Sequence, residues 1–332
     1  MRRRDFIGLV GGAVTARSYS AFAQQTERLR RVGILANFPE DDPEGHARVR
    51  GFARALEELG WKEGANLHTE TRWAGDIAEH YPKYARELVA LEPDVILASA
   101  SSSVAALQQI TSTLPIVFAN VIDPIGAGFI ATMAHPGGNT TGFTAFEYSI
   151  GGKWLELLKE LTPGLKRVAV VREPSYAAGI GQFAAIQALA SSSSPSGLEL
   201  TAIDPRNPDA IEPAIASFAS QPNAGVIVAA GSSSVTHRVL LIALMMNYRL
   251  PAVYPFPYYS SAGGLASYGP DSVNVHTRAA YYVDRILKGE RPADLPVQAP
   301  TKYQLSINLR TAKALGLAAP PSLVETADEV IE

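Results

Sequence analysis

The stretch Asp94-Val-Ile-Leu-Ala-Ser-Ala-Ser-Ser-Ser-Val104 decides the fold of this chain, and it recurs as Gly225-Val-Ile-Val-Ala-Ala-Gly-Ser-Ser-Ser-Val235. Both runs lead to a second apolar segment, Leu114-Pro-Ile-Val-Phe118 after the first and Leu250-Pro-Ala-Val-Tyr254 after the second. Each repeat predicts a strand, a hydroxyl-rich turn, a helix and another strand. Because such turns lie at the carboxyl ends of parallel strands, the repeat predicts two similar lobes that face one another across a cleft.

Short apolar segments alternate with amphipathic segments along most of the chain, and the alternation restarts after Gly152. The sequence therefore predicts an α/β fold of two Rossmann-like lobes with parallel sheets. We expect the first lobe to comprise residues 27–146 plus about 265–302, and the second lobe 147–264 plus about 303–332. The chain would then cross between the lobes several times and form a multi-crossover hinge.

The first 23 residues have the pattern of an export signal peptide. A basic start is followed by a weakly apolar stretch and by Ala21-Phe-Ala23, which fits a small-x-small cleavage site. Arg3-Arg4-Asp-Phe-Ile7 also fits the twin-arginine pattern, whose signals tend to be weakly hydrophobic. The sequence leaves both the twin-arginine and the general secretory route open. It predicts an exported, soluble, periplasmic protein.

Composition argues against several classes of function. Removal of residues 1–23 would change the net charge from −3 to −6, which gives no reason to expect nucleic-acid binding. The chain has no cysteine, so disulfides, thiolate metal sites, a cysteine nucleophile and a lipid-anchoring cysteine are excluded. The histidines show no metal-ligand spacing, and no mature segment approaches about 18 consecutive apolar residues. We expect no cofactor, no metal, no catalysis and no insertion into a membrane.

Serines in the two repeated turns are the first candidates for binding a ligand. Ser101, Ser102 and Ser103 open a helix, where hydroxyls and free backbone N–H groups would suit a carboxylate. Ser232 and Ser233 have the corresponding place in the second lobe. The same serines could simply cap their helices, and both roles remain open at this point.

Asn120 and Asp123 follow the fourth expected strand and could accept hydrogen bonds from an ammonium group. A carboxylate and a helix N-terminus on one wall of the cleft would then bind the two ends of a zwitterion. Asp123 precedes Pro124, however, and this pair also suits the start of a helix, so a capping role is an equal alternative.

Aromatic residues gather at the same expected level, after the first and second strands, in the loop after Val171 and after the Leu250-Pro251 strand. Their rings could stack on a flat ligand, or could pack within the lobes. With the adjacent amide Asn37, these candidates are Phe38, Trp73, Tyr176, Tyr254, Phe256 and Tyr258.

Several short segments, taken in order, resemble one family. They are Asp123-Pro-Ile-Gly-Ala-Gly128, Pro136-Gly-Gly-Asn-Thr-Thr-Gly142, Tyr282-Val-Asp-Arg-Ile-Leu-Lys-Gly289, Pro292-Ala-Asp-Leu-Pro296 and Ile307-Asn-Leu-Arg-Thr-Ala-Lys-Ala-Leu-Gly316, with the twin-arginine start. Together they are similar to ABC-transporter substrate-binding proteins of the tryptophan/tyrosine-uptake type, which have the type I periplasmic binding fold.

This resemblance implies two lobes joined by three crossovers and a small ligand, such as an amino acid or an aromatic or aliphatic carboxylate, held between them by hinge closure. It implies partnership with a membrane permease and its ATPase, and it implies no catalysis.

An exported NAD(P)-dependent oxidoreductase is the alternative from another class. Gly179-Ile-Gly181-Gln-Phe-Ala184 fits a dinucleotide-binding glycine pattern, and Asp204 stands about where a ribose-binding acid belongs. The fingerprint requires its first glycine directly after the strand, whereas residues 172–178 intervene here. A hydrolase lacks support because no Gly-x-Ser-x-Gly elbow occurs, and a sugar-repressor-like regulator would need a DNA-binding segment where the export signal stands.

Overall fold

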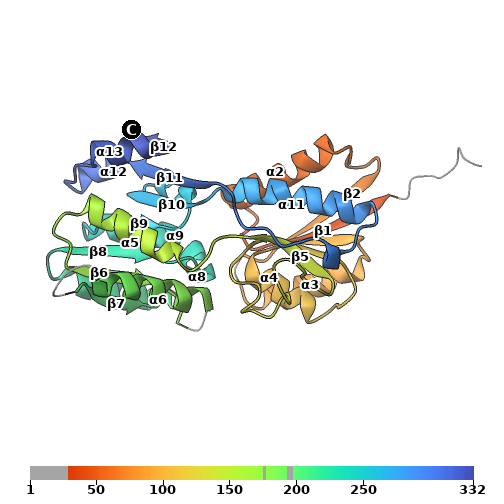
Figure 1. The fold of residues 1–332 in the computed structure, drawn as a ribbon, viewed down its shortest axis with the longest axis horizontal. Helices are drawn as coiled ribbons and strands as arrows, with labels where there is room; N and C mark the ends of the chain where they lie inside the picture. The colour runs from red at the N-terminus through yellow and green to blue at the C-terminus, as the bar shows by residue number, and fades with distance from the viewer. Residues whose placement is uncertain (1–28, 76, 175–176, 193–196) are drawn as a thin grey trace, which may run out of the picture.

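The computed structural model describes residues 29–75, 77–174, 177–192 and 197–332. These residues form two α/β lobes that lie side by side, the first on a five-stranded sheet and the second on a seven-stranded sheet (Figure 1). The expected signal at residues 1–23 lies outside the described residues. Two mostly parallel sheets covered by helices confirm the predicted fold class.

The first-lobe sheet has the order β2-β1-β3-β4-β5, and all of its strands run parallel. β3, β4 and β5 are buried throughout, as their continuous apolar or small-residue sequences predict for strands covered on both faces. The bounds are β1 (Arg30–Ala36), β2 (Leu67–Trp73), β3 (Val95–Ser99), β4 (Ile116–Val121) and β5 (Thr140–Thr144).

Helices from distant parts of the sequence cover this sheet. α2 (Pro43–Glu58) and α11 (Ser272–Leu287) lie side by side and share one hydrophobic cluster, which includes Phe52 of α2 and Ala279 of α11 (Figure 1). α3 (His80–Ala90) and α4 (Ala100–Gln108) contribute to the cluster on the opposite face. The first lobe is therefore completed by a helix from the C-terminal part of the chain.

The second-lobe sheet has the order β12-β11-β10-β9-β8-β6-β7, and β10 pairs antiparallel with β11 while the other pairs are parallel. Its strands are β6 (Arg167–Val171), β7 (Glu199–Ile203), β8 (Ala224–Val228), β9 (Ala252–Tyr254), β10 (Ala266–Pro270), β11 (Tyr303–Asn308) and β12 (Glu329–Ile331). Its helices are α5 (Ile150–Leu161), α6 (Ala177–Ser192), α7 (Pro208–Ala219), α8 (Ser232–Thr236), α9 (Arg238–Asn247), α10 (Pro257–Ser261), α12 (Leu309–Ala314) and α13 (Pro321–Thr326).

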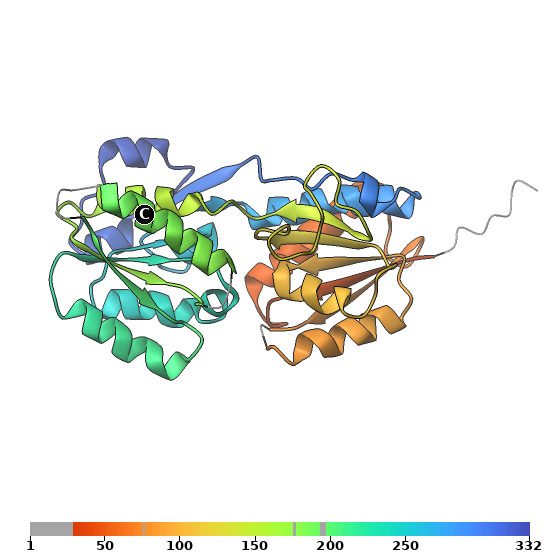
Figure 2. The same ribbon diagram turned by 60° about the horizontal axis from the view of Figure 1, so that its bottom comes forward.

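The described chain passes between the lobes at three places, which Figure 2 shows as the connections at their junction. These are residues 145–149 between β5 and α5, Asp271 between β10 and α11, and residues 299–302 after the short 3-10 helix η1 (Pro292–Asp294). The expected return to the first lobe at about residue 265 is too early, because β10 belongs to the second-lobe sheet: it pairs with β9 at Ala266 and Ser267 and with β11 as far as Pro270.

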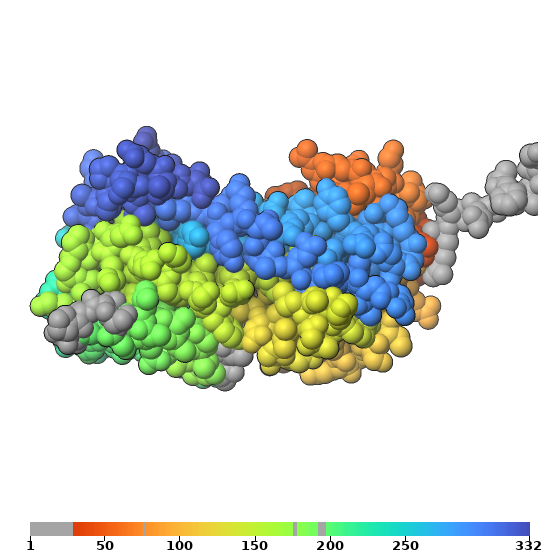
Figure 3. Space-filling model, in the orientation of Figure 1, coloured from red at the N-terminus to blue at the C-terminus, as the bar shows by residue number. Residues whose placement is uncertain are grey.

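The two lobes meet directly, as the space-filling view shows (Figure 3). Phe38 and Ile122 of the first lobe belong to the hydrophobic cluster of the second, and Trp73 packs against that cluster. Among the helices that the structure describes, none combines the length and the apolar character needed to cross a bilayer.

Candidate ligand-binding site between the lobes

The interlobe boundary, where first-lobe strand ends meet α8 and α10 of the second lobe, is centred on Phe38 and Tyr258. Their rings meet edge to face with centroids 6.4 Å apart. Phe38 is the second residue after β1 and is only 2% exposed. Tyr258 lies in α10, and its ring also stacks on Phe256 with centroids 5.4 Å apart. Three of the predicted aromatic candidates are therefore in contact.

The adjacent amide, Asn37, is buried with its Oδ1 atom lacking a hydrogen-bond partner in the described part of the chain. A buried polar atom without a partner loses about 1–3 kcal/mol of solvation, so native proteins usually avoid it. A polar ligand group at the end of β1 would supply the missing bond.

Asn120 shows the same feature more strongly. It lies within β4 rather than after it, at the point where the pairing of β4 with β5 shifts register between Ala119 and Val121. Its φ of +60° is in the left-handed region, which few non-glycine residues adopt. Both Oδ1 and Nδ2 are buried and unpaired as far as the described residues extend. Such bulges re-aim a side chain, and strained residues of this kind cluster at functional sites.

The second lobe contributes two further unpaired oxygens. Ser234 is fully buried at the start of α8, and its Oγ has no partner within the described ranges. Its carbonyl accepts a 2.8 Å hydrogen bond from the Tyr259 hydroxyl, and Tyr259 stacks on Tyr258. The Tyr258 hydroxyl is likewise buried; the Arg48 guanidinium is near enough to favour its ionised form, but no described side chain meets it with hydrogen-bond geometry. Burial of this hydroxyl raises the pKa of the Tyr258 phenol, while another part of the residue is exposed to solvent.

The predicted serines take different places from one another. α4 begins at Ala100, so Ser101, Ser102 and Ser103 lie in its first turn and none of them is its N-cap. Ser103 is fully buried and donates a 3.1 Å hydrogen bond to the Leu35 carbonyl, which is an internal role in the first lobe. Ser101 is buried and Ser102 half-buried at the same helix start.

In the second lobe, Ser232 and Ser233 are half-buried in the first turn of α8. The Ser233 N–H donates a 2.8 Å hydrogen bond to Glu173 Oε1. This donor, which the sequence analysis assigned to a ligand, is therefore already bonded to a carboxylate of the same lobe.

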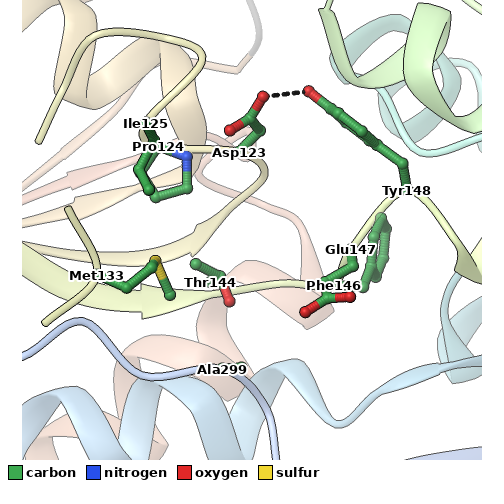
Figure 4. Close-up of a pocket in the computed structure, with 9 residues that line it drawn as sticks. All are labelled: Asp123, Pro124, Ile125, Met133, Thr144, Phe146, Glu147, Tyr148 and Ala299. Carbon is green, nitrogen blue, oxygen red and sulfur yellow. Dashed lines mark hydrogen bonds between the residues drawn. The ribbon is translucent and has the colours of Figure 1, made fainter. Parts of the chain in front are cut away.

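Asp123 lies at the hinge end of the boundary. Its Oδ1 accepts the Gly126 N–H at 2.8 Å within a turn, and its Oδ2 accepts the Tyr148 hydroxyl at 2.6 Å (Figure 4). No helix lies between β4 and β5, a stretch that the structure describes throughout, so the expected helix-capping role of Asp123 is wrong. Asp123 and Tyr148 form part of the lining of a cavity of about 250 Å³, into which Phe146 and Glu147 also project (Figure 4).

The remaining aromatic candidates divide between core and boundary. Tyr254 is 1% exposed and stacks on Tyr259 with centroids 5.0 Å apart, so it is part of the second-lobe core. Phe256 is buried and also contacts Phe146 of the first crossover. Trp73 ends β2 and lies 4.9 Å from the His46 ring. Tyr176 lies outside the described residues.

Sequence reasoning missed a buried amide of the second lobe and an ion pair across the boundary. Gln182 of α6 is fully buried; its Oε1 accepts the Ala230 N–H at 3.1 Å, and its Nε2 is unpaired among the described atoms. Asp42 and Arg238 form an ion pair across the boundary. No local pattern marks these residues, because each has its partner in a distant part of the chain. The structure shows no cluster of metal-ligating side chains in the ranges it describes.

The glycine pattern of the oxidoreductase alternative has a packing explanation. Gly179 and Gly181 lie inside α6, not in a turn directly after β6. A Cβ on Gly179 would lie 2.7 Å from the Glu173 carbonyl oxygen, and one on Gly181 would lie 2.5 Å from the Tyr148 ring. Asp204 pairs with Arg206 at 2.7 Å, and this pairing lowers the pKa of the Asp204 carboxyl.

Comparison with known proteins agrees with this architecture. Residues 35–331 match the family described as ABC transporter substrate binding protein. The curated tyrosine-binding protein of Clostridioides difficile (strain R20291) is 25% identical over 295 residues, which are 88% of this chain and 82% of that protein.

Three solved structures share the fold. A conserved domain protein from Vibrio cholerae has a TM-score of 0.84 at 26% identity, covering 91% of this chain and 100% of the other. An ABC domain from Streptococcus pneumonia in complex with L-Trp has a TM-score of 0.83 at 23% identity, covering 91% and 99%. A ligand-free, open substrate binding protein from Clostridium difficile has a TM-score of 0.68 at 24% identity, also covering 91% and 99%.

The two lobes and their crossovers define a two-lobed binding protein of the periplasmic type. The chain belongs to the ABC transporter substrate binding protein family, and it is the ligand-binding component of such a transporter. The predicted family and binding function are confirmed. The oxidoreductase alternative has no support from the fold or the relatives.

Proposed function

We propose that this protein captures an aromatic amino acid between its lobes and delivers it to an ABC permease and ATPase, with no chemical step of its own. The observation that carries this proposal is the set of buried, unpaired polar atoms on two facing walls: Asn37 Oδ1, both amide atoms of Asn120, Ser234 Oγ and the Tyr258 hydroxyl. The set contains donors and acceptors, as a zwitterion requires.

The aromatic surroundings favour a flat side chain on the ligand. Phe38, Tyr258 and Phe256 form a continuous series of rings beside the unpaired polar atoms. Stacked or edge-to-face contacts with such rings contribute about 0.5–1.5 kcal/mol beyond the burial of area. Ser101 and Ser102, at the start of α4, are further candidates for the ligand carboxylate.

The named relatives support this ligand class. One is called a tyrosine-binding protein, and one solved structure is a complex with L-Trp. The present lobe arrangement agrees better with the L-Trp complex than with the ligand-free, open structure, at nearly equal sequence identity. The direct contact of Phe38 with Tyr258 fits a closed arrangement.

We also propose that residues 1–23 direct export to the periplasm by the twin-arginine route and are removed there. The pattern Arg3-Arg4-Asp-Phe-Ile7 and the small residues before Gln24 support this part of the proposal.

Calorimetry and thermal unfolding of the chain from Gln24, with L-tryptophan, L-tyrosine, L-phenylalanine, benzoate and arabinose, test the ligand class. A ligand present at about 1,000 times its dissociation constant adds about 4 kcal/mol to the free energy of unfolding. We expect a large shift for aromatic amino acids and none for arabinose. A shift with arabinose alone would overturn the proposed class. Two matched variants complete the test. Asn120→Ala removes an amide at the interlobe boundary, and the control Asn139→Ala removes one away from it.

A further inference from the structure

We propose that Asp42 of the first lobe and Arg238 of the second form a latch that determines ligand affinity without touching the ligand. This inference rests on the proposed function, because it concerns closure around a bound molecule. Arg238 Nη2 donates to Asp42 Oδ2 at 2.5 Å, and the two residues are 196 positions apart. Their side chains are 16% and 7% exposed, so the pair is largely removed from water.

The first-lobe half of the latch is fixed before the lobes meet. Asp42 is the N-cap of α2, and its Oδ1 accepts the N–H groups of Glu44 and Gly45 at 2.9 and 3.3 Å. Oδ2 is thereby held toward the second lobe by the backbone of the first. A preorganised acceptor loses little conformational entropy when the guanidinium arrives.

Arg238 closes over the aromatic contact of the interlobe boundary. Its guanidinium carbon lies 5.9 Å from the ring centroid of Phe38 and 5.8 Å from that of Tyr258. Arg48, which pairs with Glu44 at 2.8 Å, lies 4.6 Å and 5.7 Å from the same two centroids. Two cations therefore flank one edge-to-face ring pair, and such contacts strengthen when water is excluded.

The position of the pair fixes which step of binding it affects. The two partners belong to different lobes, so the bond exists only in the closed arrangement of the lobes. Loss of the bond should lower the population of the closed state and raise the dissociation rate, with little effect on association. The ligand contacts themselves would be unchanged.

Two variants isolate the latch. Asp42→Asn keeps an oxygen for the helix cap but removes the charge, and Arg238→Gln keeps a polar side chain without the guanidinium. Arg30→Gln is the matched control, because Arg30 pairs with Asp94 at 2.8 Å within the first lobe. With L-tryptophan and L-tyrosine as probes, we expect the dissociation rate measured by stopped flow to rise at least about tenfold in both latch variants and to be unchanged in the control. The dissociation rate of the double variant should be close to that of either single variant.

Unchanged dissociation rates in both latch variants, or fully additive effects in the double variant, would overturn the latch. If the wild-type chain binds neither probe, the proposed ligand class fails while the latch is still tested. Because the chain has no cysteine, Glu79→Cys and Asp209→Cys place one label on each lobe at exposed positions. Energy transfer between the labels should then show fewer closed molecules in the latch variants. If neither probe binds and the latch variants have the same distance distribution as the wild type, the latch is overturned.

Discussion

Ser99 Oγ and His276 Nε2 lie 2.9 Å apart inside the first lobe, while His276 Nδ1 lies 2.8 Å from the Ser272 carbonyl oxygen. A carbonyl only accepts, so Nδ1 carries the proton and Nε2 accepts from the Ser99 hydroxyl. The imidazole is fully buried, and desolvation, with the Arg48 charge as a lesser cause, lowers the pKa of His276 to about 3. This neutral histidine connects α11 with the carboxyl end of β3.

The buried histidine predicts a loss of stability in acid. In the unfolded chain, its pKa returns to about 6.5, so the unfolded state binds a proton that the native state excludes as the pH falls from 6.5 toward 3. The contribution of His276 is therefore complete above pH 6.5 and should be smaller by about 2 kcal/mol at pH 5. Urea unfolding at pH 7 and pH 5 measures it. In His276→Gln this part of the pH dependence should vanish, and an equally steep dependence in the variant would count against the assignment.

Replacing Asn120 should separate stability from binding. Asn120→Gly relieves a left-handed backbone and removes two unpaired polar atoms, so we expect the ligand-free free energy of unfolding to be unchanged or raised by about 1 kcal/mol. Affinity for an aromatic amino acid should fall at least tenfold, a loss of about 1.4 kcal/mol. Calorimetry and urea unfolding of the same preparation test both. Full affinity in the variant would remove Asn120 from the site.

Loss of the hydrogen bond between Asp123 and Tyr148 at the hinge should have only a small effect on stability. Tyr148→Phe removes the 2.6 Å hydrogen bond but keeps the ring, and it should lower the free energy of unfolding by about 1 kcal/mol because the freed carboxylate can still reach water. Tyr281→Phe, at a position 49% exposed on α11, is the control and should change nothing. Equal stability of both variants would mean that the bond contributes nothing net.

The proposed export signal gives a prediction in cells. Replacing Arg3 and Arg4 together with lysine keeps the basic charge but removes the twin-arginine pattern. We expect the precursor to accumulate in the cytoplasm and the mature form to disappear from the periplasmic fraction, as immunoblotting of fractionated cells would show. Normal processing of the lysine variant would favour the general secretory route.

The fold could be predicted largely from the sequence because its signals are local. The repeated strand, serine turn and helix correspond to β3 with α4 and to β8 with α8. β10 was assigned to the wrong lobe, because its partners β9 and β11 are set by pairing and not by its own residues.

The candidate site was predicted less completely. The structure brings Phe38 and Tyr258 into contact across the boundary, with Asn37 next to Phe38 in the chain. Their part in binding a ligand stays a prediction. The sequence could not show whether Tyr254 lies in the core or at the boundary. In a strand covered on both faces, side chains on either face are buried, so their alternation gives no signal. The register shift at Asn120 and the pairing of Asp42 with Arg238 depend on contacts that no sequence window contains.

The place of α11 beside α2 has a consequence for biosynthesis. Residues 272–287 supply part of the core of a lobe that otherwise ends near residue 144, so a ribosome must make most of the chain before that lobe can be completed. An N-terminal fragment emerging during translation would carry the exposed apolar face of α2 with no cover. The first lobe should therefore complete its folding only late in synthesis. A chain truncated after the first sheet should aggregate instead of forming a half-sized domain.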